Sequence, residues 1–171
     1  MKITKKMSDY ILLLTALSVA LIAGLFYAYS CSVNTGLGRL SDIEYLSAMQ
    51  AINKAILNPW FFGSFMGSML LLPMSTWLQF SSEQYLRFYL LLGATIIYLI
   101  GVFGVTAFGN VPLNERLAGA DLITLSGQAI GDLRTAFENP WLQYHMVRTL
   151  AAILTLILVI TSCLQQNPKA I

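Results

Sequence analysis

Four long apolar runs dominate the chain, and polar segments of unequal length separate them. The runs cover about residues 11–29, 60–80, 88–108 and 141–163. A helix needs about 20 mostly apolar residues to cross the roughly 30 Å hydrocarbon core of a bilayer, so each run is long enough. The pattern therefore predicts four transmembrane helices.

The two long polar segments, 32–57 and 113–138, also carry apolar residues at helical spacing. In the first segment this spacing predicts an amphipathic helix lying against the bundle, with Ser41 or Asp42 as its N-cap. In the second it predicts a short helix capped by Asn114 and an amphipathic helix over about 126–137. The short turn at 81–87 predicts that the second and third spans are antiparallel neighbours.

An Asn-Pro-Trp triplet occurs twice, at 58–60 and at 139–141. Asn is a preferred N-cap and Pro a preferred first helical residue, so each triplet is predicted to begin a span, with its Trp at a membrane interface. Superposing the triplets gives two units of span, amphipathic segment, cap and span. The predicted fold is an all-α polytopic membrane four-helix bundle, built from two parallel αα repeats with amphipathic extramembrane helices, in one domain over 1–171.

Composition agrees with a membrane protein, because 57% of the 171 residues are hydrophobic and only 11% are charged. The net charge of +2 is small and scattered, which argues against a nucleic-acid partner. A cleaved signal peptide is disfavoured because the run 11–29 is long and serves as a member of the repeat. Lys2, Lys5 and Lys6 predict cytoplasmic termini, in a bacterial inner (plasma) membrane, with both long segments outside.

The chain's single histidine, His145, falls in the fourth span together with Arg148. On a helix these two residues share a stripe with Trp141 and Tyr144. Two interpretations are open: Arg148 snorkels to the headgroups while His145 bonds at the interface, or both face a polar site inside the bundle. No acidic residue lies within a predicted span, so Arg148 needs a loop carboxylate, neutral acceptors or an anionic ligand.

Metal and disulfide chemistry have little support in the sequence. One histidine and no closely spaced cysteine pair exclude the usual zinc and iron patterns, and a haem held by His145 alone has no supporting motif. Cys31 and Cys163 fall at opposite membrane faces in a four-span topology, so no disulfide is predicted. No metal and no cofactor are predicted.

Three groups of residues resemble a known family. They are 49–53 followed by Asn58-Pro59, then 110–114 after the third span, and finally Trp141, His145 and Arg148-Thr149. In these the chain resembles the small four-span membrane proteins grouped with fungal anthrone oxygenases. The resemblance implies oxidation of an anthrone, a tricyclic aromatic ketone, to an anthraquinone with molecular oxygen, without a metal or flavin.

Such a reaction needs a base, an oxyanion site and a flat apolar pocket. His145 is predicted as the base, with Arg148, Asn110 and Asn114 holding the oxyanion. The predicted ligand-binding residues are aromatic side chains of the spans and two amides of the motif at 49–53: Tyr27, Gln50, Asn53, Tyr98, Trp141 and Tyr144.

Two other functions remain open. The chain can be a non-catalytic binder or carrier of a lipid-soluble compound, using the same pocket. It can also be a structural subunit that packs other membrane proteins, which predicts no interior cavity. The expected partners are an apolar small molecule and the bilayer, with a homo-oligomer also open.

Overall fold

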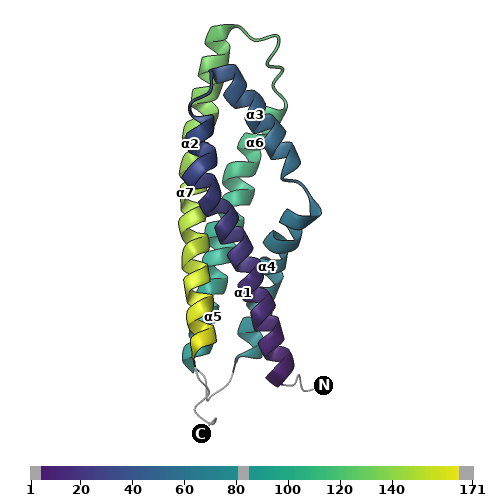
Figure 1. Ribbon diagram of the computed structural model, residues 1–171, viewed down its shortest axis with the longest axis vertical. Coiled ribbons are helices and arrows are strands. Elements are labelled where there is room, and N and C mark those ends of the chain that lie inside the picture. The colour runs from purple at the N-terminus through teal and green to yellow at the C-terminus, as the bar shows by residue number, and fades with distance from the viewer. Residues whose placement is uncertain (1–4, 81–84, 166–171) are drawn as a thin grey trace.

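Four long helices run side by side along the molecule (Figure 1). The computed structural model describes residues 5–80 and 85–165, which contain no β-strand. The first helix joins α1 (Lys5–Ala28), the π-helical turn η1 (Tyr29–Val33) and α2 (Asn34–Leu37), and the second is α4 (Pro59–Leu78). The third joins α5 (Tyr85–Ile97), the π-helical segments η2 (Tyr98–Gly104) and η3 (Thr106–Asn110), and α6 (Val111–Ala118), and the fourth is α7 (Gly127–Leu164).

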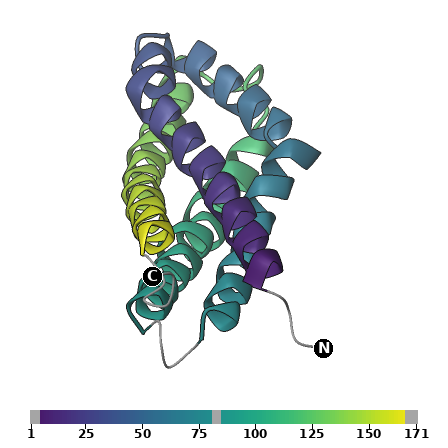
Figure 2. The ribbon, with the colours of Figure 1, turned by 60° about the horizontal axis from the view of Figure 1, so that its bottom comes forward.

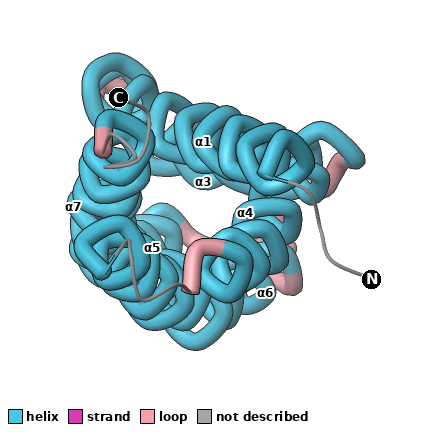
Figure 3. Tube along the Cα trace, turned by 90° about the horizontal axis from the view of Figure 1, so that it is seen from below, coloured by secondary structure: helices cyan, strands magenta, loops and turns pink. Residues whose placement is uncertain are grey.

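All four helices are long and apolar enough to cross a membrane. Their outer faces carry many exposed large apolar side chains, such as Leu13, Leu70, Ile100 and Leu150, as a lipid environment requires. The predicted all-α polytopic bundle is confirmed, and the chain is an integral membrane protein. Figure 3 shows the helices arranged around a common axis.

Both long polar segments lie at the same end of the bundle, as predicted. In Figures 1 and 2, α1 begins and α7 ends at one end, whereas α3 (Asp42–Ala55) and the loop at 119–126 lie at the other. Arg134 of α7 fastens the two segments together, since it donates to Asp42 at 2.9 Å and to the carbonyl oxygen of Leu40 at 2.9 Å. The predictions that the termini are cytoplasmic and that a short turn joins the second and third spans concern Lys2, residues 81–84 and residues 166–171, which lie outside the described residues.

Three helix starts follow the local sequence. Ser41 and Glu44 form a capping box at the start of α3, as predicted for Ser41. Asn58 caps α4 by accepting hydrogen bonds from the backbone N–H groups of Trp60 and Phe61, at 3.0 and 3.1 Å. Ser126 caps α7 through the backbone N–H of Ala129.

The second Asn-Pro-Trp triplet does not begin a helix, so this prediction is wrong. The helix α7 runs for 38 residues with Pro140 inside it, and the predicted helix at 126–137 is its first part. Pro140 removes one backbone donor, but the segments on either side are anchored, because Phe137 and Trp141 are both buried. Tertiary packing therefore overrides the local signal for a helix start at Asn139-Pro140.

The predicted repeat rests on the equivalence of the two triplets, and they are not equivalent. The first triplet begins α4, whereas the second lies inside α7. The indole of Trp60 is 89% exposed, whereas that of Trp141 is 3% exposed. Trp60 is exposed as an interfacial anchor must be, whereas Trp141 is buried inside the protein and does not contact the surroundings as such an anchor would.

Two further boundaries differ from the predictions. The third helix does not end near Gly109 but passes through η3 into α6, which places Asn114 inside a helix and not at its cap. Pro112 lies in the first turn of α6, where a missing N–H is tolerated. The first helix likewise continues beyond residue 29 as far as Leu37.

The buried apolar residues form two clusters. The larger one lies among the four spans and includes Val19, Phe65 and Val102. The smaller one joins α3, α6 and the first half of α7 through Leu46, Leu117 and Phe137, among others. The candidate site borders both clusters.

Candidate functional site

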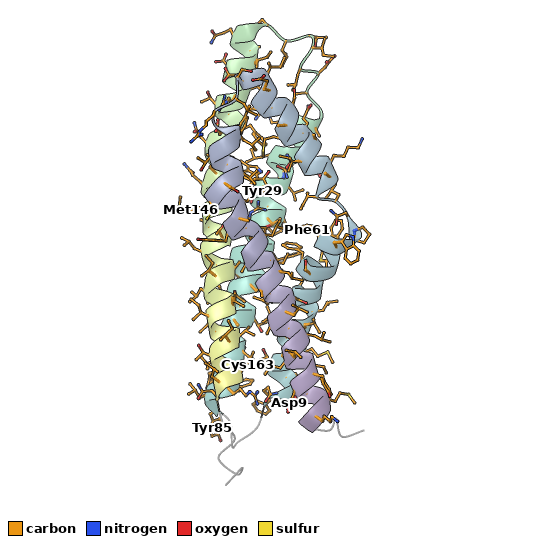
Figure 4. The ribbon with its side chains drawn as sticks, viewed as in Figure 1. Asp9, Tyr29, Phe61, Tyr85, Met146 and Cys163 are labelled. Carbon is orange, nitrogen blue, oxygen red and sulfur yellow. The ribbon has the colours of Figure 1, made fainter. Side chains whose placement is uncertain are left out.

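A cavity of about 550 Å³ lies where the two apolar clusters meet. Its wall is mostly apolar and draws on every long helix and on α3. The lining residues are Leu25, Phe26, Tyr29, Gln50, Ile52, Asn53, Lys54, Ile56, Leu57, Phe61, Thr106, Val111, Asn114, Glu115, Ala118, Trp141 and Arg148. Tyr29 and Phe61 are labelled in Figure 4 and mark the walls formed by the first and second helices. The volume falls within the roughly 300–1,000 Å³ typical of small-molecule sites.

Arg148 supplies the buried positive charge of this wall. Its side chain lies between two aromatic rings, with the guanidinium carbon 4.4 Å from the ring centroid of Phe26 and 5.2 Å from that of Trp141. Arg148 is 9% exposed, and no carboxylate in residues 5–80 and 85–165 lies within salt-bridge distance of it. Glu138, a carboxylate of the polar segment before the fourth span, pairs with Arg134 at 2.7 Å and not with Arg148.

His145 lies directly behind Arg148 and does not line the cavity. Its ring stacks on the indole of Trp141, with centroids 5.1 Å apart and planes at 12°. Arg148 donates to His145 Nδ1 from Nε at 3.3 Å and from Nη2 at 3.1 Å. Because a guanidinium is only a donor, Nδ1 holds a lone pair and the proton of a neutral ring is on Nε2.

The other ring nitrogen completes a consistent chain of hydrogen bonds. Nε2 lies 2.9 Å from Ser30 Oγ, and this hydroxyl donates to the carbonyl oxygen of Phe26 at 3.1 Å. Ser30 lies in η1, so the π-helical turn of the first span brings the hydroxyl to the histidine. Both nitrogens of His145 are therefore engaged by protein groups.

Trp141 is held by two asparagines of the third helix. Its indole Nε1–H donates to Asn114 Oδ1 at 2.9 Å, and its carbonyl oxygen accepts from Asn110 Nδ2 at 3.2 Å. Asn114 lines the cavity, whereas Asn110 is 1% exposed and lies behind the wall. The third helix thus fixes the ring that covers Arg148.

Several polar atoms at the site have no hydrogen-bond partner among residues 5–80 and 85–165. Thr106 Oγ1 and Asn53 Nδ2 are buried and unpaired in residues that line the cavity, and Asn110 Oδ1 is unpaired behind it. Thr106 and Asn110 both belong to η3, and π-helical turns are frequent at functional sites. Unpaired buried polar groups are rare in folded proteins, so a ligand or water in this cavity is the expected partner.

The cavity opens between the end of α3 and α6. The exposed residues of its lining lie there, among them Lys54 and Leu57 on one side and Glu115 and Ala118 on the other. The mouth of the cavity thus carries one cation and one carboxylate, whereas Arg148 is buried in the inner wall.

The predicted ligand-binding residues divide into two groups. Gln50, Asn53 and Trp141 line the cavity, and Gln50 also donates to the carbonyl oxygens of Leu117 and Ala120, at 2.8 and 3.0 Å, which ties α3 to the end of α6. The other three, all tyrosines, lie elsewhere.

Tyr27 is 59% exposed on the outer face of α1. Tyr98 is fully buried in the bundle and donates to the carbonyl oxygen of Phe65 at 2.8 Å. Tyr144 is 41% exposed, and its ring packs on Gly109 so closely that a β-carbon at this glycine would lie 2.7 Å from the ring. None of these three residues lines the cavity.

The sequence interpretation missed Tyr29, Phe61 and Thr106 on the wall and Ser30 behind it. The last turn of the first span was the available signal, because Ser30 follows Phe26 by one helical turn and shares its face. The π-helical turn that orients this face has no sequence signal that we can name.

No group of three or more metal-ligating side chains occurs in the described part of the chain. Both cysteines, Cys31 and Cys163, are free and exposed. What the arrangement offers chemically is an apolar cavity with one buried cation and a few hydrogen-bonding groups.

Fold and cavity together define a polytopic helical membrane protein with an internal, mostly apolar cavity that has one buried cation in its wall. The chain belongs to the anthrone oxygenase family, whose model matches residues 59–158. The matched region contains Asn114, Trp141, His145 and Arg148, whereas the walls formed by α1 and α3 lie outside it. No curated protein and no solved structure matches the chain significantly.

Proposed function

We propose that this protein oxidises an apolar polycyclic or phenolic compound with molecular oxygen inside the cavity. The observation that carries the proposal is Arg148, a cation buried in the wall of an apolar cavity without a carboxylate partner among the described residues. Membership of the anthrone oxygenase family supports the same class of chemistry. The cavity itself argues against a purely structural subunit.

The proposed reaction converts a methylene group flanked by aromatic rings into a ketone. Loss of a C–H proton gives an enolate whose charge rests on the ring oxygen, and Arg148 stabilises this oxyanion in a low-dielectric site. The enolate carbon then forms a bond to O₂, a proton completes a hydroperoxide, and loss of water leaves the new carbonyl group. The sum, R₂CH₂ + O₂ → R₂C=O + H₂O, balances without an added reductant.

The proton acceptor in this proposal is Glu115. It is the carboxylate that lines the cavity within the described ranges, and it lies next to Asn114. His145, the base suggested by the sequence, is absent from the wall and has both ring nitrogens engaged. A general base must come within hydrogen-bonding distance of the proton it removes, which favours Glu115 over His145.

The test is turnover of a supplied anthrone by the purified protein in lipid nanodiscs under ¹⁸O₂. We expect oxygen uptake above the rate without protein, and one ¹⁸O atom in the new carbonyl group of the anthraquinone. Arg148→Met should lower the turnover rate by about 10²- to 10³-fold, the usual effect of removing one oxyanion donor. Glu115→Gln should lower turnover while leaving binding of the anthraquinone product unchanged.

A carrier of lipid-soluble compounds gives a different result in the same experiment. It binds the anthraquinone and loses affinity in Arg148→Met, yet takes up no more oxygen than the sample without protein. That outcome would replace the oxygenase proposal with the carrier.

A further inference from the structure

We infer that His145 is a positioning residue, which holds the guanidinium of Arg148 against the cavity wall so that it binds an acidic oxygen of the ligand. The inference rests on the proposed function for the ligand class but not on turnover, because it concerns binding alone. It gives His145 a role distinct from proton transfer.

His145 Nδ1 accepts two hydrogen bonds from the guanidinium of Arg148. Arg148 donates two N–H groups, from Nε and Nη2, to this single nitrogen at 3.3 and 3.1 Å. The remaining terminal nitrogen, Nη1, has no hydrogen-bond partner among the described residues, and Arg148 lines the cavity. His145 therefore fixes one edge of the guanidinium and leaves the other for a ligand.

The residues around His145 hold its ring in one orientation. The ring is 2% exposed, stacked on Trp141, and bonded through Nε2 to Ser30, whose hydroxyl donates to the carbonyl oxygen of Phe26. This chain fixes the tautomer in which Nδ1 is the acceptor. A protonated ring would present an N–H to the donors of Arg148, so the arrangement requires a neutral histidine.

The side chains that can replace the Nδ1 acceptor provide the test. Asn at position 145 places Oδ1 close to the position of Nδ1, whereas Gln places its amide closer to Nε2 and Leu offers no acceptor. If His145 positions Arg148, Asn should rescue function and Leu should not. If His145 is the base, Asn and Leu should fail alike.

The experiment measures binding of a hydroxyanthraquinone with one acidic phenol, whose absorption reports ionisation of the bound molecule. In nanodiscs, the wild-type protein should bind the phenolate more tightly than the neutral phenol. His145→Leu should weaken phenolate binding by about tenfold or more and change binding of the neutral phenol much less, because only the phenolate needs an oriented cation. His145→Asn should stay within a few-fold of wild type.

Two controls separate positioning from a loss of structure. Thr155→Val alters a fully buried residue of α7 that is not on the cavity wall, and it should change neither affinity. Ser30→Ala removes the partner of Nε2 but keeps Nδ1 as an acceptor, so it should weaken phenolate binding only a few-fold. A misfolded variant would lose the neutral phenol and the phenolate together.

The inference is overturned if His145→Leu retains full preference for the phenolate, or if His145→Asn loses it as Leu does. Normal binding by His145→Asn without turnover of an anthrone that the wild type oxidises leaves the positioning role intact and overturns only the choice of Glu115 as the base, because His145 is then the proton acceptor. A wild-type protein that binds the phenolate preferentially but oxidises nothing leaves the positioning role intact and removes only the oxygenase proposal.

Discussion

The two Asn-Pro-Trp triplets allow one sharp comparison, because the same substitution should act in opposite directions at the two sites. Asn58→Ala removes a helix cap: Asn58 accepts from two backbone N–H groups at the start of α4, and its amide donates to the carbonyl oxygen of Ala55 at 2.9 Å. Asn139→Ala removes no such contact, because Asn139 lies exposed inside α7 and its side chain forms no hydrogen bond with the described residues.

The magnitudes follow from the two environments. Loss of an Asn cap costs about 1 kcal/mol of stability, within a range of roughly 0.5–2 kcal/mol. In a helix interior Ala is favoured over Asn, so Asn139→Ala should stabilise the protein by up to about 0.7 kcal/mol. The two variants should therefore differ by about 1.5 kcal/mol in free energy of unfolding, with opposite signs relative to wild type.

Reversible unfolding with sodium dodecyl sulfate in mixed micelles, followed by circular dichroism, measures both variants under one condition. Differences between variants are more reliable than absolute stabilities, because the reference state is shared. Equal destabilisation by the two substitutions would show that Asn139 caps a helix after all. The continuous helix α7, and the site built on it, would then be wrong.

Three further predictions address topology, packing and pH. Single cysteines can replace Lys54 and Ile123 in a background in which both native cysteines are serine. Both should react with a membrane-impermeant maleimide from the same side of the membrane. Labelling from opposite sides would contradict the arrangement of the bundle. Gly101→Ala should destabilise the protein by about 1–3 kcal/mol, because the added β-carbon would lie 2.7 Å from the β-carbon of Ala151 in α7. In the same unfolding assay the control Gly24→Ala should be neutral or stabilising, because its β-carbon meets nothing within 4 Å. Hydrogen bonds from the capping box lower the pKa of Glu44 below its ordinary value of 4.5, so its contribution to α3 is present above that pH and is lost as pH falls through the lowered pKa. The protection of amide hydrogens in α3, corrected for the pH dependence of the intrinsic exchange rate, should fall there in wild type, and Glu44→Gln should abolish this dependence.

Helix starts were predictable where the capping atoms lie within a few residues of the helix they cap. Ser41 and Asn58 both satisfy backbone groups two or three residues ahead, and both predictions are confirmed. Such local hydrogen bonds are encoded in the sequence around them.

The predicted helix boundaries were wrong where contacts from distant parts of the chain decide whether a helix continues. The triplet at 139–141 carries a local start signal, but Arg134 and Phe137 pack the preceding segment onto α3, and α7 continues through Pro140. A single sequence read without its partners gives no measure of that packing.

The stripe of Trp141, His145 and Arg148 was also predictable, because helical spacing alone places these residues on one face. All three are buried, as an interior polar site requires, and Arg148 does not snorkel to the surface. Which of them lines the cavity was not predictable. That depends on the first helix, where Phe26 packs against the guanidinium of Arg148 and Ser30 bonds to His145, although Arg148 and His145 lie one turn apart.

The tyrosines at the end of the first span divide as helical spacing requires. Tyr27 and Tyr29 are two residues apart, which is about 200° around the helix, so Tyr27 faces outward and Tyr29 lines the cavity. On the outer face, Tyr10 and Tyr27 are both exposed, and they are separated by roughly 26 Å at 1.5 Å per residue. This separation is close to the thickness of the hydrocarbon core, so Tyr27 fits a membrane anchor better than a ligand contact.

The cost of burying Arg148 bears on why the site exists. A cation held inside a protein without a carboxylate partner destabilises the fold by several kcal/mol, and the two aromatic rings and one neutral histidine that surround it offset only part of this. Two further buried polar atoms of the cavity wall, Thr106 Oγ1 and Asn53 Nδ2, also lack partners within the described part of the chain. Stability alone would favour an apolar residue at position 148 and full pairing of these atoms. Under the proposed function, an oxyanion that the ligand brings or develops beside Arg148 would supply the missing charge, so the unfavourable burial of the cation would contribute to binding and stabilising that anion.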